Sequence, residues 1–333
     1  GRFGGVFGLW YGKGPGVDRS GDVLRHANMA GSSQNGGVIM AMGDDHTGES
    51  STVLHQSDWA MVDAAIPVIS PAGVQEILDY GHYGYALSRF AGVWVGLKTM
   101  KDTIEVTSVV DGNPNRMQFK KPEIDLPDGG LNIRLVDLPV DQEARLLRHK
   151  ISAAESFARK NRIDQRGLGQ AGAKIGIVAA GKNWLDVQHA ISVLGIDQDE
   201  AVRLGITTYK VVQMWPLDKT SLREWAEGLD LIIVVEEKRK LIEPQIKDAV
   251  FHDANHCRVY GGEQGDLGTL LFPSEGALDP IDIAQSLGQI FVEEGCGDQK
   301  ITDGLALIAN AKHADNASDI AARLPYFCAG CPH

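Results

Sequence analysis

Acidic, imidazole and amide side chains gather just after a short apolar run near residue 40. Asp44, Asp45 and His46 follow the run directly, and His55 and Gln56 come a few positions later. Histidines beside carboxylates can transfer protons near neutral pH, and ligands bind beyond the carboxyl ends of strands in open α/β sheets. The pattern therefore predicts either a proton-transfer site or a capped, solvated loop, since Ser and Asp also cluster at helix N-termini.

A glycine-rich segment, Tyr11–Arg19, is the second candidate. Its glycines alternate around Lys13 and precede Arg19, and glycine lets the backbone approach an anionic group closely. The spacing to the lysine differs from that of a phosphate-binding P-loop, and no strand clearly precedes it. The segment is either an anion-binding loop or a simple surface loop.

Two charged segments lie at the ends of predicted strands in the second half of the chain. Gly181 and Lys182 stand at a strand-to-helix turn, where a helix N-terminus can hold phosphate, although an ordinary turn fits the same residues. Glu236–Arg239 places four charges together, and we expect them to form salt bridges at a domain interface.

The pair Cys328 and Cys331 places two thiols on one tight turn. Such a pair serves zinc, an iron–sulfur cluster or a redox disulfide. A metal site needs about two more ligands, and Cys257 and Cys296 stand at no matching spacing. Two ordinary thiols in a loop are the alternative.

Apolar runs alternate with helical segments along most of the chain. We expect strands at 37–42, 64–69, 93–97, 174–180, 207–212 and 231–235, with helices at 71–89, 184–194, 217–228 and 242–251. This alternation of strands and helices along the chain predicts parallel sheets covered by helices. Turn-forming residues at 111–139 indicate a linker, and a helix should follow at 141–161.

Composition excludes several classes of protein. The net charge is −12, which disfavours nucleic acid and anionic membranes as partners. No apolar run approaches the length of about 20 residues that spans a bilayer. Four cysteines in 333 residues form no disulfide framework, so we expect a cytoplasmic protein. Both ends of the sequence read as cuts within a longer protein.

The chain carries, in order, the segments Gly8–Asp22, Gly43–Asp58, Pro71–Glu76, Gly181–Val187, Val235–Arg239 and Pro325–His333. Together they resemble the thiamine-diphosphate-dependent 2-oxoacid:ferredoxin oxidoreductases of the indolepyruvate type. The resemblance implies an α/β fold with two doubly wound parallel-sheet domains. It implies a partial pyrimidine-side domain at 1–122, a linker and helix at 123–172, a transketolase-C-terminal-like domain at 173–295, and a connector with the start of a diphosphate-side domain at 296–333.

The resemblance also implies a reaction, the oxidative decarboxylation of an aryl pyruvate such as indolepyruvate. Coenzyme A takes the acyl group and ferredoxin takes the electrons. The resemblance implies that the full-length protein holds thiamine diphosphate, magnesium and an iron–sulfur cluster. It also implies that the full-length protein is a homo-oligomer. Residue roles follow from the match: His46 and His55 as proton carriers; Asp44, Asp45, Gln56, Gly181 and Lys182 at the cofactor; Lys13 and Arg19 at the substrate carboxylate; and Cys328 and Cys331 as metal ligands.

Three departures from the family pattern bear on this chain alone. The pyrimidine-side domain starts late, so we expect the glutamate that activates thiamine to be missing from this sequence, and we expect no gamma-type domain in it. Thr302-Asp303-Gly304 with Asn310 has the wrong residues and spacing for the motif that binds magnesium and diphosphate. We therefore expect this chain by itself to bind no thiamine diphosphate tightly and to be inactive. Two alternatives stay open: the same chemistry on another 2-oxoacid such as pyruvate, and a non-catalytic α/β assembly module whose cysteine pair holds structural zinc.

Overall fold

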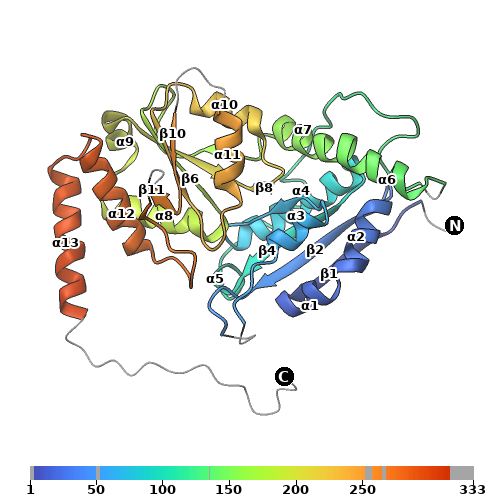
Figure 1. Ribbon diagram of the computed structural model, residues 1–333, viewed down its shortest axis with the longest axis horizontal. Helices are drawn as coiled ribbons and strands as arrows, with labels where there is room; N and C mark the ends of the chain where they lie inside the picture. Colours follow the sequence, from blue (N-terminus) through green and yellow to red (C-terminus); the bar gives the residue numbers. More distant parts are fainter. Residues whose placement is uncertain (1–3, 50–52, 135, 252–256, 265–267, 316–333) are drawn as a thin grey trace, which may run out of the picture.

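Two five-stranded sheets form the framework of the chain, each with helices packed on its faces (Figure 1). The computed structural model describes residues 4–49, 53–134, 136–251, 257–264 and 268–315. Among the helices in these ranges, none is long and apolar enough to cross a bilayer. The predicted α/β class with two parallel-sheet units is confirmed.

The first sheet has the strand order β1-β2-β4-β3-β8, and its first four strands are parallel. Its strands are β1 (Phe7–Lys13), β2 (Gly37–Asp44), β3 (Val68–Ile69), β4 (Trp94–Met100) and β8 (Gln213–Trp215). Its helices are α1 (Gly14–Arg19), α2 (Gly21–Ala30), α3 (Asp58–Asp63), α4 (Val74–Ala91) and α5 (Lys101–Ile104). Asp44 pairs with Met100 across β2 and β4, so the carboxyl ends of these two strands lie level.

The second sheet has the order β10-β9-β6-β7-β5, with β5 antiparallel at one edge. Its strands are β5 (Gln165–Arg166), β6 (Ile175–Ala180), β7 (Ile206–Val211), β9 (Leu231–Val235) and β10 (Arg258–Tyr260); β11 (Glu263–Gln264) and β12 (Thr269–Leu270) form a separate hairpin. Its helices are α8 (Gly181–Val193), α9 (Gln198–Leu204), α10 (Lys219–Ala226), α11 (Ile242–Val250), α12 (Pro280–Glu293) and α13 (Gln299–Asp315). Strands β6 and β9 are buried along their whole length, as expected for central strands covered on both faces.

Strand β8 ties the two units together. It follows β7 of the second sheet but pairs antiparallel with β3 of the first, with Val68 opposite Trp215. One carboxylate oxygen of Asp164 accepts the backbone N–H groups of Val212 and Gln213, at 2.7 and 3.1 Å, and so fixes the passage between the sheets. Sequence patterns did not predict this strand, because three residues carry no measurable period.

One of the three buried hydrophobic clusters spans the junction of the two units. Met42 and Ile66 of the first unit share one buried cluster with Val211 and Val234 of the second. The core therefore crosses the proposed domain boundary near residue 173. The two units bury apolar surface against each other as the layers of one domain do.

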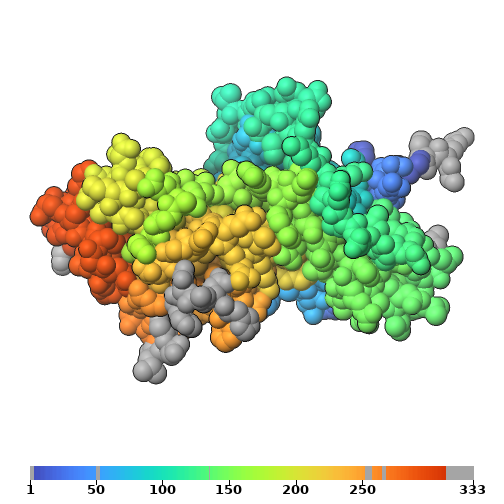
Figure 2. Space-filling model, turned by 90° about the horizontal axis from the view of Figure 1, so that it is seen from above, coloured from blue at the N-terminus to red at the C-terminus, as the bar shows by residue number. Residues whose placement is uncertain are grey.

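The segment between the units contains one long helix and an extended stretch. Helix α6 (Pro139–Arg145) continues through a π-helical turn, η1 (Leu146–Lys150), into α7 (Ile151–Asn161), where Phe157 stacks on Phe90 of α4 at 5.2 Å. Residues 105–134 and 136–138 hold neither helix nor strand, and the teal part of this stretch projects from the elongated body in Figure 2.

Two local predictions are wrong. The segment Tyr11–Arg19 is not a loop but the end of β1 followed by α1, because β1 pairs with β2 as far as Lys13 and Pro15 suits the first turn of a helix. The strand expected at 64–69 is reduced to β3, preceded by α3.

Candidate functional site

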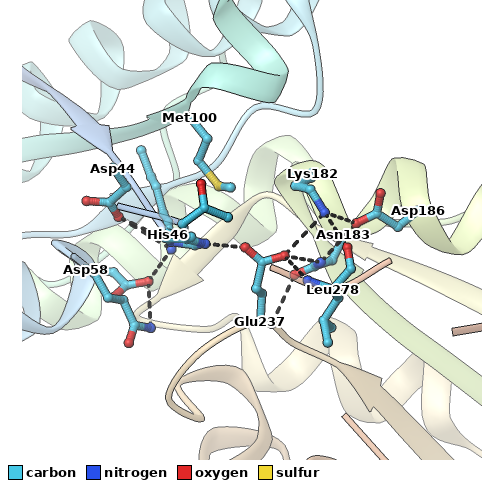
Figure 3. Close-up of polar contacts among 12 residues, drawn as sticks. Asp44, His46, Asp58, Met100, Lys182, Asn183, Asp186, Glu237 and Leu278 are labelled. Carbon is cyan, nitrogen blue, oxygen red and sulfur yellow. Dashed lines mark hydrogen bonds and ion pairs between the residues drawn. The ribbon is translucent and has the colours of Figure 1, made fainter. Parts of the chain in front are cut away.

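The carboxyl ends of the two sheets face each other and enclose a buried network of charged side chains (Figure 3). Asp44 ends β2, His46 lies just after it, and Lys98 belongs to β4. Glu237 follows β9, and Lys182 lies in the first turn of α8. We call these five residues and their direct partners the junction network.

His46 and Glu237 make the contact that crosses between the units. The His46 Nδ1 atom is hydrogen-bonded to Glu237 Oε1, and His46 and Glu237 are only 4% and 5% exposed. Burial tends to raise the pKa of Glu237, but the bond from His46 and the charge of Lys182 lower it to about 2. The carboxylate is therefore ionised at neutral pH, so Nδ1 carries the proton and donates it.

The other side of the network is held by Lys98. Its ammonium donates to Asp58 Oδ2 at 2.7 Å and lies 3.7 Å from Asp44 Oδ2, with all three side chains buried. Burial alone would lower the pKa of Lys98, yet the two carboxylates raise it above its ordinary value. Burial opposes ionisation of Asp44 as well, but His46, His55 and Lys98 hold its pKa far below the usual range.

Lys182 anchors Glu237 from the side of the second unit. Its ammonium donates to Asp186 at 2.7 Å and to the Leu278 carbonyl at 2.9 Å, and lies 3.3 Å from Glu237 Oε2. Asn183 accepts the backbone N–H of Glu237 at 3.0 Å. The lysine predicted to meet a cofactor phosphate thus already has two carboxylate partners.

His55 lies at the rim of the network, where its side chain is 13% exposed. Its Nε2 atom is 3.1 Å from Asp18, and its Nδ1 atom is 3.2 Å from the Ser57 hydroxyl and 3.5 Å from Asp44. The Asp44 carboxylate raises the pKa of His55, partial burial opposes this, and Asp18 adds to the increase. Gly14 of α1 lies under the ring, since a Cβ there would be 2.2 Å from it.

Gln56 makes a second contact between the units. Its amide donates to the Arg239 carbonyl at 3.2 Å and accepts from the Arg239 backbone N–H at 3.2 Å. The Arg239 guanidinium in turn lies 5.5 Å from the Trp59 ring centre, a favourable cation–π distance. Glu237 and Arg239 therefore both contact the first unit, but Arg239 does so through hydrogen bonds and its ring contact, without the predicted salt bridge. Glu236 instead accepts the first backbone N–H groups of α11.

The remaining predicted site residues lie around the network. Asp45 is half-buried and accepts the backbone N–H of Glu49. Gly181 has a φ of +52°, and a Cβ there would lie 2.2 Å from the Ser70 hydroxyl. Lys13 ends β1, and Arg19 ends α1 with an exposed side chain.

A small cavity of about 20 Å³ lies within the junction, lined by His46, Lys98, Lys182 and Glu237 among others. His46 Nε2 has no hydrogen-bond partner among the described residues. A cavity of this size admits about one water molecule, whereas cofactor pockets measure roughly 300 Å³ or more. Thiamine diphosphate therefore does not fit between the two units as they stand.

Sequence reasoning missed Lys98 as a member of the network, and it assigned no role to Ser57 and Asp58, although both lie in the matched segment Gly43–Asp58. Ser57 donates its backbone N–H to both Asp44 oxygens at 3.0 Å. Lys98 could have been found as a lone cation directly after the apolar run of a predicted strand, and in the sheet it lies opposite Met42 of β2.

None of the four cysteines is a member of the junction network as it is defined above. Cys328 and Cys331 are outside the described residues. The Cys257 thiol donates to the Arg258 carbonyl at 3.6 Å. Cys296 has a free thiol, and burial raises its pKa. Within the part of the chain that the structure describes, no group of three or more His, Cys, Asp or Glu side chains is arranged to hold a metal ion.

Comparison with known proteins adds the family relationship. Residues 165–315 match the family described as "Indolepyruvate oxidoreductase domain". The chain is 27% identical over 236 residues to indolepyruvate oxidoreductase subunit IorA of Pyrococcus abyssi, covering 68% of this chain and 34% of that protein. It is 26% identical over 315 residues to the IorA subunit of Pyrococcus horikoshii, covering 90% of this chain and 43% of that protein. The chain thus spans less than half the length of these relatives.

A solved structure shares the fold. The 2-oxoglutarate:ferredoxin oxidoreductase of Magnetococcus marinus, which contains 2-oxoglutarate, coenzyme A and succinyl-CoA, superposes with a TM-score of 0.54 at 13% identity, covering 85% of this chain and 53% of that one. At that identity the likeness concerns the fold alone. Residues 165–315 are therefore similar to the indolepyruvate oxidoreductase domain family, and most of the chain is similar to the IorA subunits.

Proposed function

We propose that this chain is part of an oxidoreductase that oxidatively decarboxylates aryl pyruvates, with indolepyruvate as the substrate. The observation that carries the proposal is the similarity to IorA subunits over 90% of the chain. The shared fold of a 2-oxoacid:ferredoxin oxidoreductase supports the same reaction class. Another 2-oxoacid such as pyruvate is the alternative substrate.

The proposed reaction breaks the bond between the carboxyl and keto carbons of the substrate. Carbon dioxide leaves, coenzyme A receives the acyl group, and the electrons pass to ferredoxin. Thiamine diphosphate, with magnesium, supplies the electron sink for the decarboxylation when bound. We assign these cofactors and an iron–sulfur cluster to the longer protein. The water-sized cavity at the junction does not admit thiamine diphosphate.

His55 is the proton carrier that the geometry favours. It is partly exposed at the rim, whereas His46 is buried and bonded to Glu237. Asp18 and Asp44 hold both ring nitrogens of His55 and raise its pKa, so the ring can donate a proton near neutral pH. We propose that Lys13 and Arg19, on the same edge of the first unit, attract the substrate carboxylate, and that Asp45 and Gln56 face the cofactor-holding part of the longer protein.

The test is an anaerobic assay of the complete protein that contains this chain. Ferredoxin reduction is followed with coenzyme A and either indolepyruvate or pyruvate. A higher kcat/KM for indolepyruvate supports the proposal, a higher value for pyruvate overturns the substrate, and no reduction with either acid overturns the function. Zinc without iron in the purified protein favours the assembly module.

The role of His55 is tested by His55→Gln in the same assay. Loss of a proton carrier lowers kcat by about 100-fold or more. The matched control is His26→Gln, whose side chain is 80% exposed on α2 and whose replacement should leave kcat unchanged. Equal rates for the two variants would remove His55 from the chemistry.

A further inference from the structure

Strand β1 forms an open border of the first sheet (Figure 1). It pairs with β2 in unbroken register over seven residues, and no other described strand lies on its far side. Every second backbone N–H and C=O group of such an edge strand points away from the sheet. The other border strands, β5, β8 and β10, have only two or three residues each. β1 is therefore the longest open edge in the part of the chain that the structure describes.

The edge of β1 lacks the features that usually prevent pairing. Proteins protect exposed edges with charged residues, prolines, bulges or very short strands. From Phe7 to Gly12 the strand contains no charged residue and no proline, and its register with β2 shows no bulge. The Tyr85 hydroxyl of α4 donates to the Gly8 carbonyl at 3.1 Å and so fixes the beginning of the strand. The strand can therefore accept a further strand along its outer side.

Apolar side chains on one face of β1 are exposed beside α4. Phe7, Leu9 and Tyr11 alternate along the strand and so share a face. Leu9 lies opposite Ile39 of β2, which is buried in one cluster with residues of α4. Leu9 is nevertheless 60% exposed, and Phe7 and Tyr11 are 68% and 80% exposed. Helix α4 therefore covers this face at β2 but leaves it open at β1.

A groove of about 410 Å³ continues this surface between α4 and residues 117–119. The Arg89 side chain at its border is exposed, and its Nε atom donates to the Gly36 carbonyl. Within the described ranges the Arg89 guanidinium forms no ion pair, so it can pair with an acidic group of a partner. The groove itself suits an apolar side chain. Its lining is formed by Phe7, His82, Tyr85, Ala86, Arg89, Met117 and Phe119.

We propose that the open edge of β1 binds a further β-strand, which is supplied by the part of the complete protein that lies outside this chain. The partner strand is apolar at alternate positions, so that its side chains cover Leu9 and Tyr11. One of its apolar side chains enters the groove beside Phe7, and an acidic residue pairs with Arg89.

Two observations favour this partner over a second copy of the chain. The match to the IorA subunit of Pyrococcus horikoshii covers only 43% of that protein, so such a relative has enough further sequence to supply a strand. Two copies of this chain repel each other, because each has a net charge of −12. The interface does not depend on the proposed reaction, and its tests need no substrate.

Photo-crosslinking in the complete protein identifies what covers the edge. Tyr11→p-benzoylphenylalanine places the reactive group on the exposed face of β1, and mass spectrometry identifies the captured peptide. We expect a crosslink within one polypeptide, to a segment outside residues 1–333. The matched control is Leu307→p-benzoylphenylalanine on α13, where the side chain is 64% exposed. The proposal is overturned by a crosslink to residues 1–333 of either copy, by a crosslink to another polypeptide, by no crosslink, or by equal capture of the same segment from position 307.

Hydrogen exchange in the same complete protein tests the strand pairing itself. The amides of β1 that point towards β2 are protected in any case, whereas the outward amides are protected only if another strand bonds to them. We expect every amide from Leu9 to Gly12 to exchange at least about 100-fold more slowly than an unbonded amide in residue-resolved mass spectrometry.

The variant Leu9→Asp places a charge on the covered face and should speed exchange of the outward amides by about tenfold or more. Leu307→Asp is the control and should leave their exchange unchanged. Rapid exchange of alternate amides in the unmodified protein, or unchanged exchange in Leu9→Asp, refutes the interface.

Discussion

The substitution Glu237→Gln tests the physical basis of the junction network. It keeps the size of the side chain but removes the charge that faces His46 and Lys182. Lys182 keeps another carboxylate partner in the variant, because its ammonium also donates to Asp186 at 2.7 Å. The variant should therefore fold and lose mainly the electrostatic contribution of one carboxylate.

The magnitude follows from the pKa of Glu237. The network lowers it from an ordinary 4.5 to about 2, and at about 1.36 kcal/mol for each pKa unit this difference corresponds to about 3 kcal/mol of stability. The side chain is 3% exposed, so solvent screening does not reduce the figure much. Removal of one partner of a buried ion pair leads to a similar loss of about 3–5 kcal/mol.

The sign of the pH dependence makes the test specific. A carboxyl whose pKa is lowered by folding stabilises the protein above its ordinary pKa, and this contribution is lost as the pH falls from 4.5 towards 2. The difference in stability between the wild type and Glu237→Gln should therefore be full at pH 7 and shrink below pH 4.5.

The assay is urea unfolding followed by circular dichroism at several pH values. With a slope of about 3 kcal/mol per molar urea, the midpoint at pH 7 should fall by about 1 M. The control is Glu105→Gln at an exposed position after α5, which should leave the midpoint unchanged. A loss below about 1 kcal/mol at pH 7, or a loss that does not shrink in acid, would refute the reasoning.

Three further substitutions probe the same region, each measured by urea unfolding. Lys98→Met leaves the buried Asp58 carboxylate without its cation and should cost about 3 kcal/mol or more; adding Asp58→Asn should recover part of it, and no recovery would contradict the pairing. Gly181→Ala forces an alanine into a φ of +52° against the Ser70 hydroxyl and should cost about 2 kcal/mol; Ser70→Ala in the same chain should reduce the loss. Burial raises the pKa of Glu236 from 4.5 to about 7 against the opposing N–H groups of α11, so the folded protein loses stability as the pH rises between these values. Glu236→Gln should remove up to about 3 kcal/mol of this pH-dependent loss of stability. The urea midpoints of the variant at pH 5 and pH 8 should therefore differ less than those of the wild type.

The sequence was sufficient to predict the class of fold and most of its elements. Runs such as Leu231–Val235 are apolar throughout and short, which is the pattern of a strand buried on both faces. The first and last strands of the first sheet were missed for different reasons. β1 is half-exposed and rich in glycine, so it resembles a loop, and β8 is too short to have a period.

The candidate site was predicted in parts but not as a whole. Asp44, His46, Lys182 and Glu237 each stood out locally, at the ends of predicted strands. Their association depends on the carboxyl ends of the strands in the two sheets facing each other, and His46 and Glu237 are 191 positions apart. Local patterns carry no information on such a contact. Lys98 was overlooked because a lysine after an apolar strand usually marks its exposed end, whereas here Asp58 and Asp44 neutralise it inside the protein.

The arrangement of the two sheets has a consequence for ligand binding. Parallel sheets usually bind ligands beyond the carboxyl ends of their strands, but here those ends face each other and charged side chains fill the space between them. A ligand larger than water can enter only if Glu237 separates from His46 and Lys182. If that separation costs the about 3 kcal/mol assigned to Glu237, the affinity of such a ligand is reduced by about 100-fold relative to an open site. Glu237→Gln should therefore weaken the fold and, at the same time, strengthen any binding that requires the junction to open.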